Sequence, residues 1–160
     1  LCLRLSQAQR RRRALQFFRA VSKAGDGLFW FVLAGLLPLL LGAAALPTVR
    51  RMAAVGIAAA LVSKALKIAT GRSRPFSANA GVLLGAAPLD RYSFPAGHTL
   101  HAVAFSIVVL ATHGFLAWIL VPFTLAVALS RVVLGLHYPT DVAAGAVVGS
   151  LLALSTLALL

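Results

Sequence analysis

Five apolar stretches, each close to the length that a helix needs to cross a bilayer, dominate this chain. A membrane-spanning helix takes about 20 mostly apolar residues, because the hydrocarbon core offers its backbone no hydrogen-bond partners. Composition agrees, since 61% of the residues are hydrophobic and the mean hydropathy is +0.95. The sequence therefore predicts an all-α integral membrane helical bundle of about five transmembrane helices, with spans at 28–46, 52–70, 98–112, 115–131 and 139–160.

The N-terminal segment is strongly basic and mixes arginine with large apolar side chains. Such a mixture suits a helix in the headgroup region, so we expect a basic amphipathic helix over 1–24 that contacts anionic phospholipid. The alternative is a positively charged anchor that only sets the topology. Asp26, between two glycines, is placed to cap the next helix. Residues 28–160 would form the transmembrane bundle, and 1–160 a single domain.

The formal charge of +12 sets 15 Lys and Arg against three acids, Asp26, Asp90 and Asp141. Basic excess in so hydrophobic a chain indicates contact with anionic lipid or with a phosphate substrate. Nucleic acid is not an expected partner, because no basic face is interleaved with aromatic residues. Cys2 is the only cysteine, which excludes an intramolecular disulfide and a thiolate metal cage.

Arg131, His137 and Asp141 are ionisable residues inside apolar sequence. Each would cost on the order of 2.5 to 3.5 kcal/mol if it faced lipid, so such groups usually face an interior site. If the second span ends near Thr70, the polar loop 71–95 keeps the chain on one side of the membrane and the next two spans form a hairpin. This topology brings six residues to one face: Lys67, Arg74, His98, Arg131, His137 and Asp141.

The cations among these residues suit a phosphate ester. Arg74 and Arg131 can offer planar, bidentate donors to phosphoryl oxygens, with Lys67 as a point charge beside them. They would neutralise the transferring phosphoryl group without a metal, and no cluster of acids is present to hold one. We therefore expect neither a metal nor another cofactor.

The two histidines and the carboxylate suit the covalent chemistry of phosphoryl transfer. Asp141 on one ring nitrogen of His137 would fix the tautomer and leave the other nitrogen free to attack phosphorus. His98 opens the third span and would be the general acid, protonating the leaving alkoxide and then activating water. A lone histidine at a helix end is more often a cap or a satisfied polar group, so this role depends on the shared face.

Three motifs together resemble a known family. They are Lys67 with Arg74-Pro75 after six residues, Pro95-Ala96-Gly97-His98, and Ser130-Arg131 with His137 and Asp141. In order and spacing, 67–141 resembles the type 2 phosphatidic acid phosphatase (PAP2) superfamily, which also includes bacterial acid phosphatases and vanadium haloperoxidases.

The resemblance implies a PAP2/haloperoxidase-like helical core with two sets of functional residues. Phosphate would be bound by Lys67, Arg74, Arg131 and the backbone N–H of Gly97. Catalysis would use His137 as a phosphohistidine, Asp141 as its support and His98 as acid and then base. One position departs from the pattern, because Ala96 stands where the family usually has serine. A hydroxyl donor to phosphate is thereby lost.

The function expected from these observations is a metal-independent lipid phosphate phosphatase. Phosphatidic acid, phosphatidylglycerol phosphate, a polyprenyl phosphate or diphosphate and a lipid-linked sugar phosphate are all open as substrates. Arg72, Arg91 and His101 are candidate headgroup contacts. The alternatives are a membrane protein that binds or moves phospholipid without cleaving it and, less favoured, a vanadate-dependent haloperoxidase.

The basic N-terminal segment and the predicted site fall on the same side of the cell (inner) membrane in this multi-pass topology. Only Arg50 and Arg51, in a short polar turn before the second span, would lie on the other side. The positive-inside rule then places the site on the cytoplasmic face. Against this, many proteins that the chain resembles work on the outer face.

Overall fold

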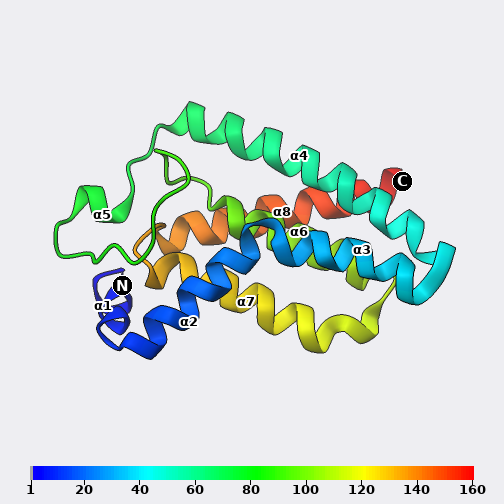
Figure 1. Cartoon of the computed structure of the whole chain (residues 1–160). Helices are drawn as coiled ribbons and strands as arrows, with labels where there is room; N and C mark the ends of the chain where they lie inside the picture. Colours follow the sequence, from blue (N-terminus) through cyan, green and yellow to red (C-terminus); the bar gives the residue numbers. More distant parts are fainter. Residues whose placement is uncertain (1) are drawn as a thin grey trace.

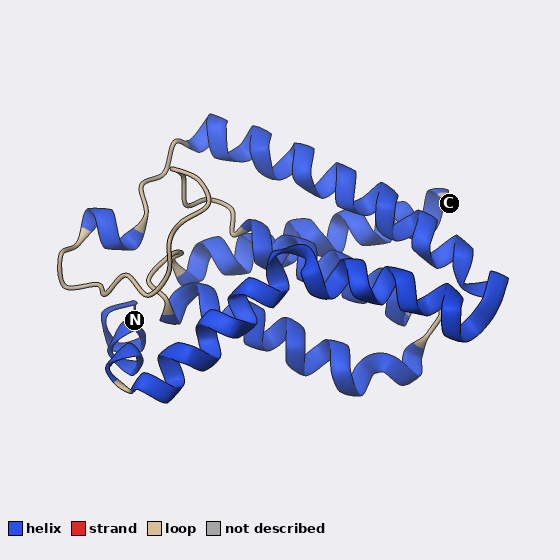
Figure 2. Ribbon diagram, in the orientation of Figure 1, coloured by secondary structure: helices blue, strands red, loops and turns tan. Residues whose placement is uncertain are grey.

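The computed structural model describes residues 2–160, and helices, turns and loops account for all of them (Figure 2). The predicted all-α architecture is confirmed. The α-helices in chain order (Figure 1) are α1 (Cys2–Ser6), α2 (Arg12–Lys23), α3 (Phe29–Leu41), α4 (Leu46–Thr70), α5 (Pro75–Ala78), α6 (Gly97–Leu110), α7 (Ala117–Val133) and α8 (Pro139–Leu159).

Helix α6 is the centre of the bundle and packs against α8, α4 and α7. The approach of α8 is so close that a Cβ at Gly145 would lie 2.7 Å from the carbonyl oxygen of Ala96. A Cβ at Gly149 would lie 2.4 Å from that of Leu100. Small residues let two helix backbones meet in this way, and the contact fixes the start of α8 against the start of α6.

The second long helix begins earlier than predicted. Arg50 and Arg51 indicated a polar turn, but α4 starts at Leu46 and includes both. Pro47 lies in its first turn, where the missing N–H of proline is not needed. The chain reverses instead just after α3, at Gly42 with φ +69°.

The N-terminal segment is less separate from the bundle than predicted. It is interrupted at Arg11, which has an extended conformation, and α2 then packs against α7. A π-type turn over Ala24–Leu28 joins α2 to α3 through a kink at Asp26 and Gly27. The expected boundary between the N-terminal helix and the transmembrane bundle is therefore a kink between two continuous helices, α2 and α3. Asp26 does not cap α3, which begins without a side-chain cap.

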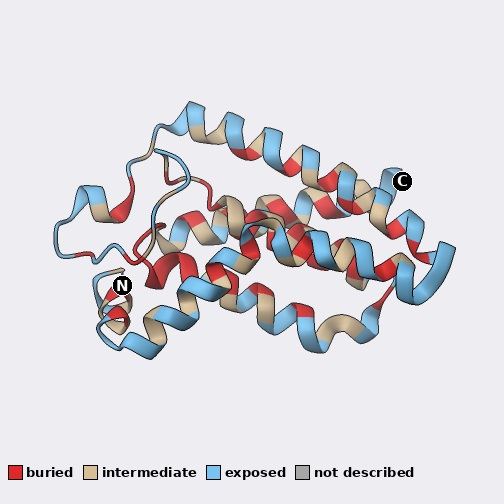
Figure 3. Ribbon diagram, in the orientation of Figure 1, coloured by how far each residue is buried: buried red, intermediate tan, exposed pale blue. Residues whose placement is uncertain are grey.

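The outer surface of the bundle is apolar. Buried residues form stripes on the inner faces of the helices, and exposed residues lie on the outer faces (Figure 3). Many of the exposed residues are large hydrophobic ones, such as Phe31, Leu39 and Trp118. Three helical stretches among the described residues are long and apolar enough to cross a membrane: Arg12–Ala78, which runs from α2 to α5, Gly114–Val133 and Pro139–Leu159. The exposed apolar surface is the one that lipid would cover in a membrane protein.

One end of the bundle collects the polar motifs. The C-terminal ends of α4 and α7 and the N-terminal ends of α6 and α8 lie there, beside α1 and the loop between α5 and α6 (Figure 1). The predicted convergence of the motifs on one face is thus present in the fold.

Candidate active site

The turn that follows α7 holds His137. The carbonyl oxygen of Arg131 accepts hydrogen bonds from the backbone N–H groups of Leu136 (3.0 Å) and His137 (3.1 Å). Gly135 turns the chain with φ +72°, and a Cβ there would lie 2.3 Å from the carbonyl oxygen of Leu83. Glycine is therefore required at this position. The five residues between Arg131 and His137 are therefore the ones needed to form this turn.

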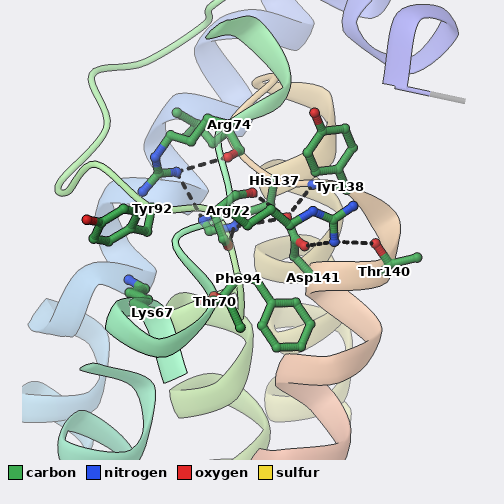
Figure 4. A network of polar contacts seen from close by, with 12 residues as sticks. Lys67, Thr70, Arg72, Arg74, Tyr92, Phe94, His137, Tyr138, Thr140 and Asp141 are labelled. Atoms are coloured by element: carbon green, nitrogen blue, oxygen red, sulfur yellow. Dashed lines mark hydrogen bonds and ion pairs between the residues drawn. The ribbon is translucent and has the colours of Figure 1, made fainter. Parts of the chain in front are cut away.

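Asp141 lies in the first turn of α8 and is fully buried. Its Oδ2 accepts hydrogen bonds from the backbone N–H of Tyr138 at 2.8 Å and from the hydroxyl of Ser93. Its Oδ1 accepts a hydrogen bond from Nη1 of Arg72 at 2.7 Å (Figure 4). Three donors, one of them charged, satisfy this buried carboxylate. The bond to Tyr138, the N-cap residue, also explains why Asp141 follows His137 at this spacing.

Ser93 stands between His137 and Asp141. Nδ1 of His137 donates to the backbone carbonyl oxygen of Ser93 at 2.6 Å, whereas the nearest oxygen of Asp141 is 3.8 Å away. The expected direct hydrogen bond from the ring to the carboxylate is therefore absent: the ring donates to the Ser93 carbonyl oxygen, and Asp141 stays at ion-pair distance. Since a carbonyl oxygen can only accept, the ring proton lies on Nδ1 and Nε2 is unprotonated.

The unprotonated nitrogen of His137 faces the predicted phosphate site. This Nε2 accepts a hydrogen bond from Nη1 of Arg74 at 3.3 Å. Burial lowers the pKa of His137 to about 4; Arg131 and Arg74 act in the same direction, and Asp141 opposes them. The ring is therefore neutral at pH 7, which is the form that can attack phosphorus.

Two of the predicted phosphate-binding cations meet at Asp90, in the loop before α6. Nζ of Lys67 pairs with Oδ2 of Asp90, and Nη2 of Arg74 lies 2.8 Å from Oδ1. Burial raises the pKa of Asp90, but the hydrogen bonds and charges of Lys67 and Arg74 outweigh it, so the pKa is lower than usual. An ionised carboxylate thus lies between the two cations, much as a phosphoryl group would.

The third predicted phosphate ligand, Arg131, is 3% exposed. Its Nη1 donates to the hydroxyl of Ser22, which belongs to α2. Its Nε is buried and has no hydrogen-bond partner within residues 2–160. An unsatisfied buried donor is costly, and a phosphoryl oxygen is a ligand that would satisfy it.

His98 lies in the first turn of α6 as predicted. Its Nε2 is 3.3 Å from Oδ1 of Asp26, in the kink between α2 and α3. Gly97 opens the same helix, and a Cβ there would lie 3.6 Å from Nζ of Lys67. The start of α6, with its free N–H groups, therefore lies beside Lys67, one of the predicted phosphate-binding cations.

One of the candidate headgroup contacts, Arg72, belongs to the inner network. Besides Asp141 it donates to Oγ1 of Thr140 at 3.0 Å, and its guanidinium carbon lies 4.3 Å from the ring centre of Tyr138. Figure 4 shows these side chains around Asp141. Arg72 therefore supports the carboxylate.

The other two candidate headgroup contacts differ in position. His101 pairs through Nδ1 with the carbonyl oxygen of Gly97 at 2.9 Å, and its ring centre is 5.8 Å from that of Phe105. Arg91 has no hydrogen bond or ion pair to the rest of the described chain, and it is exposed on the loop. His101 thus lies near the site, while Arg91 faces outward.

An apolar groove of about 1050 Å³ runs from this cluster between α3 and α4. Lys67, His98 and Asp26 line its polar end. Farther from the site its walls are apolar, with Trp30, Phe31, Ala34, Met52, Ile57 and Phe105. The groove joins the charged cluster to a space that fits a hydrocarbon chain.

Ala96 is the N-cap of α6 and provides no side-chain cap. A serine hydroxyl there would accept a backbone N–H of the first turn, worth about 1 kcal/mol, and would add a donor for phosphate. We predict that Ala96→Ser raises kcat/KM for phosphate release and raises Tm by a few degrees. Ala45→Ser is the matched control, because Ala45 is the N-cap of α4 outside the site. An unchanged or lower rate in Ala96→Ser would count against this placement.

Several residues that contact the predicted site residues were not predicted to do so, among them Ser22, Asp26, Asp90 and Ser93. Asp26 and Asp90 are two of only three acids in the chain, so the scarcity of carboxylates was a usable signal. The sequence held no comparable signal for Ser22 and Ser93, because their contacts depend on the paths of α2 and of the loop before α6.

The chain matches a family model. The model described as the PAP2 superfamily matches residues 48–160. Decaprenylphosphoryl-5-phosphoribose phosphatase of Mycobacterium tuberculosis is 35% identical over 136 residues, covering 82% of this chain and 72% of that protein. The protein of the same name in Mycolicibacterium smegmatis is 39% identical over 133 residues, with coverages of 79% and 68%. Undecaprenyl-diphosphatase BcrC of Bacillus subtilis is 37% identical over 93 residues, with coverages of 58% and 48%.

Two solved structures have a similar fold. LpxE of Aquifex aeolicus superimposes with a TM-score of 0.83 at 24% identity, covering 98% of this chain and 92% of its own. The transmembrane PAP2 type phosphatidylglycerolphosphate phosphatase of Bacillus subtilis gives 0.72 at 23% identity, with coverages of 98% and 83%. The family match, the identity to these relatives and the shared fold agree with the motif spacing, and the chain belongs to the PAP2 superfamily.

Proposed function

We propose that this membrane lipid phosphate phosphatase hydrolyses a polyprenyl-linked phosphate or diphosphate through a phosphohistidine. The main support for this proposal is the groove, because its apolar walls end at Lys67 and His98. A long hydrocarbon tail in the groove would bring its phosphate to the cations. The sequence relatives described above act, by their names, on decaprenylphosphoryl-5-phosphoribose and on an undecaprenyl diphosphate, which favours a prenyl tail over the two acyl chains of a glycerolipid.

The proposed reaction has two steps. Nε2 of His137 attacks phosphorus and forms an N–P bond while the bond to the leaving oxygen breaks. The electron pair leaves with that oxygen, which takes a proton from His98. Water then gives a proton to His98 and attacks the phosphohistidine, the N–P bond breaks, and inorganic phosphate leaves.

The cations would stabilise the charge that spreads over the phosphoryl oxygens in both steps. Arg74 is already 3.3 Å from the proposed nucleophile, and Arg131 has an unpartnered Nε. Fixed donors of this kind need little reorganisation when the transition state forms. Lys67 and the first N–H groups of α6 complete the phosphate site.

The test is phosphate release by the detergent-purified protein from a panel of lipids. We expect turnover of decaprenylphosphoryl-5-phosphoribose or undecaprenyl diphosphate to exceed that of phosphatidic acid and phosphatidylglycerol phosphate. EDTA should leave the rate unchanged and vanadate should inhibit it. Binding of these lipids without release of phosphate would indicate a lipid-binding protein instead, and vanadate-dependent halide oxidation a haloperoxidase.

We also propose that the site faces the cytoplasm, on the inner membrane. The basic residues of α2 lie at the same end of the bundle as the site, and Arg50 and Arg51 open α4 at the other end. The positive-inside rule favours this orientation. In a Cys2→Ser background, a cysteine at position 50 should react in intact cells with a membrane-impermeant thiol reagent, and a cysteine at 91 only after lysis. The reverse pattern would place the site outside.

Asp90 gives a prediction about substrate affinity. A phosphate dianion must exchange with this carboxylate to reach Lys67 and Arg74. We predict that Asp90→Asn lowers KM roughly five-fold, equivalent to about 1 kcal/mol, in steady-state kinetics. Asp90→Glu, which keeps the charge, should show no such gain. A higher KM in Asp90→Asn would mean that Asp90 positions the cations rather than competing with substrate.

A further inference from the structure

The end of α2 and the kink after it touch the proposed site twice, although they lie outside the matched family region 48–160. Ser22 accepts a hydrogen bond from Nη1 of Arg131. Four residues later, Oδ1 of Asp26 lies 3.3 Å from Nε2 of His98. One short segment thus contacts both the phosphate-binding arginine and the proposed general acid.

The backbone directs Asp26 toward His98 by leaving the helical path. Asp26 has φ −79° and ψ +19°, and Gly27 has φ +124°, a conformation that residues other than glycine rarely adopt. Gly25 is buried, and a Cβ there would lie 2.8 Å from Cγ2 of Val127 on α7. The two glycines therefore let the kink form and let it pack directly on α7.

The surroundings of His98 make a nearby carboxylate important. Its ring lies among positive charges, because Arg131 of α7 and Lys67 of α4 both act on it. The positive end of the α6 dipole adds to them. Nearby positive charge disfavours a second cation, yet a general acid must carry a proton before it can give one away.

We propose that Asp26 is the positioning residue of the general acid: its carboxylate pairs with Nε2–H of His98, holds the ring and stabilises its protonated form. This inference rests on the proposed function. With Nε2 engaged, the second ring nitrogen passes its proton to the oxygen that leaves with the electron pair of the broken P–O bond. The neutral ring then takes a proton from the attacking water, and Asp26 again stabilises the cation that forms.

The experiment compares two substrates that differ in their need for an acid. The first is the lipid alkyl phosphate that the panel shows to be turned over fastest, and the second is 4-nitrophenyl phosphate, whose phenolate leaves without full protonation. The quantity measured is kcat/KM, which reports the steps up to phosphoryl transfer. We expect Asp26→Asn to lower kcat/KM for the lipid roughly 10- to 100-fold, which is part of the contribution of general acid catalysis. For the aryl ester, kcat/KM should fall by less than about one-third of that factor.

Three variants make the result specific. Asp26→Glu should recover part of the lost kcat/KM on the lipid. In a His98→Ala background, Asp26→Asn should cause no further loss, because it acts through that ring. Lys23→Gln changes an exposed charge in the same segment and should behave as wild type.

The outcomes separate this inference from the proposed function. Wild-type protein that releases phosphate from no substrate would overturn the function itself. An active wild type with an inactive His98→Ala and an unimpaired Asp26→Asn would overturn only the role of Asp26. Equal losses on both substrates, or an additive loss in the double variant, would show that Asp26 is merely structural and would also overturn it.

Discussion

Replacing His137 with alanine should abolish phosphate release from every lipid substrate, with a loss of roughly 10⁴-fold or more in kcat. The physical reason is that, in the proposed mechanism, its Nε2 is the atom that attacks phosphorus. The ring is buried, its proton is fixed on Nδ1 by the carbonyl oxygen of Ser93, and the free nitrogen faces Arg74. The measurement is initial-rate phosphate release together with trapping of the phosphoenzyme from a radiolabelled substrate.

The trapped label should be stable in base and labile in acid, as expected for a phosphohistidine, and should be absent from His137→Ala. His113→Ala is the matched control, because His113 lies in the turn between α6 and α7 at the other end of the bundle. Its activity should stay close to that of wild type. Label retained in His137→Ala would show that another residue is the nucleophile.

Arg131→Met should lower kcat/KM by roughly 10³-fold, a loss of about 4 kcal/mol in transition-state stabilisation. Arg131 is almost fully buried and its Nε has no partner within the described residues, so under the proposed mechanism its donors would act on the bound phosphoryl group with little screening by water. Arg131→Lys should show most of the same loss in kcat/KM, because lysine keeps the charge but lacks the planar, bidentate guanidinium group.

Inhibition by vanadate provides the second measurement for Arg131 and should weaken in parallel with kcat/KM. Arg50→Met, at the far end of α4, is the matched control and should leave both quantities unchanged. Arg131→Met leaves no buried carboxylate unpaired, since the partner of its side chain within the described residues is the Ser22 hydroxyl, and Arg50 lies at the start of α4, so we expect both variants to fold. Normal vanadate inhibition in Arg131→Met would contradict a role for this side chain in phosphate binding.

The features that follow from local sequence were predictable. The apolar stretches gave the helices, and the spacing from Arg131 to His137 is a single turn closed at Gly135. The convergence of the motifs on one face needed only the order of spans. The predicted start of α4, at residue 52, was wrong, because the helix begins at Leu46. Pro47 misled the prediction, since a proline fits a first helical turn as well as it fits a loop.

The features that depend on the path of irregular backbone were not predictable. Ser93 accepts a hydrogen bond from the His137 ring and donates one to Asp141 because the loop before α6 passes beside both, and no periodic pattern encodes that path. The contact of Asp26 with His98 joins residues 72 positions apart. It depends on the direction of a kink, which glycines permit but do not specify.

The kink after α2 has a consequence for how this enzyme would use substrate binding energy. Trp30 and Phe31, about one turn beyond Asp26, line the groove, so a lipid tail would press on the segment that holds Asp26 against His98. Binding energy from a part of the substrate far from phosphorus can then be expressed in the chemical step rather than in affinity alone. Shortening the prenyl tail should accordingly lower kcat, and not only raise KM.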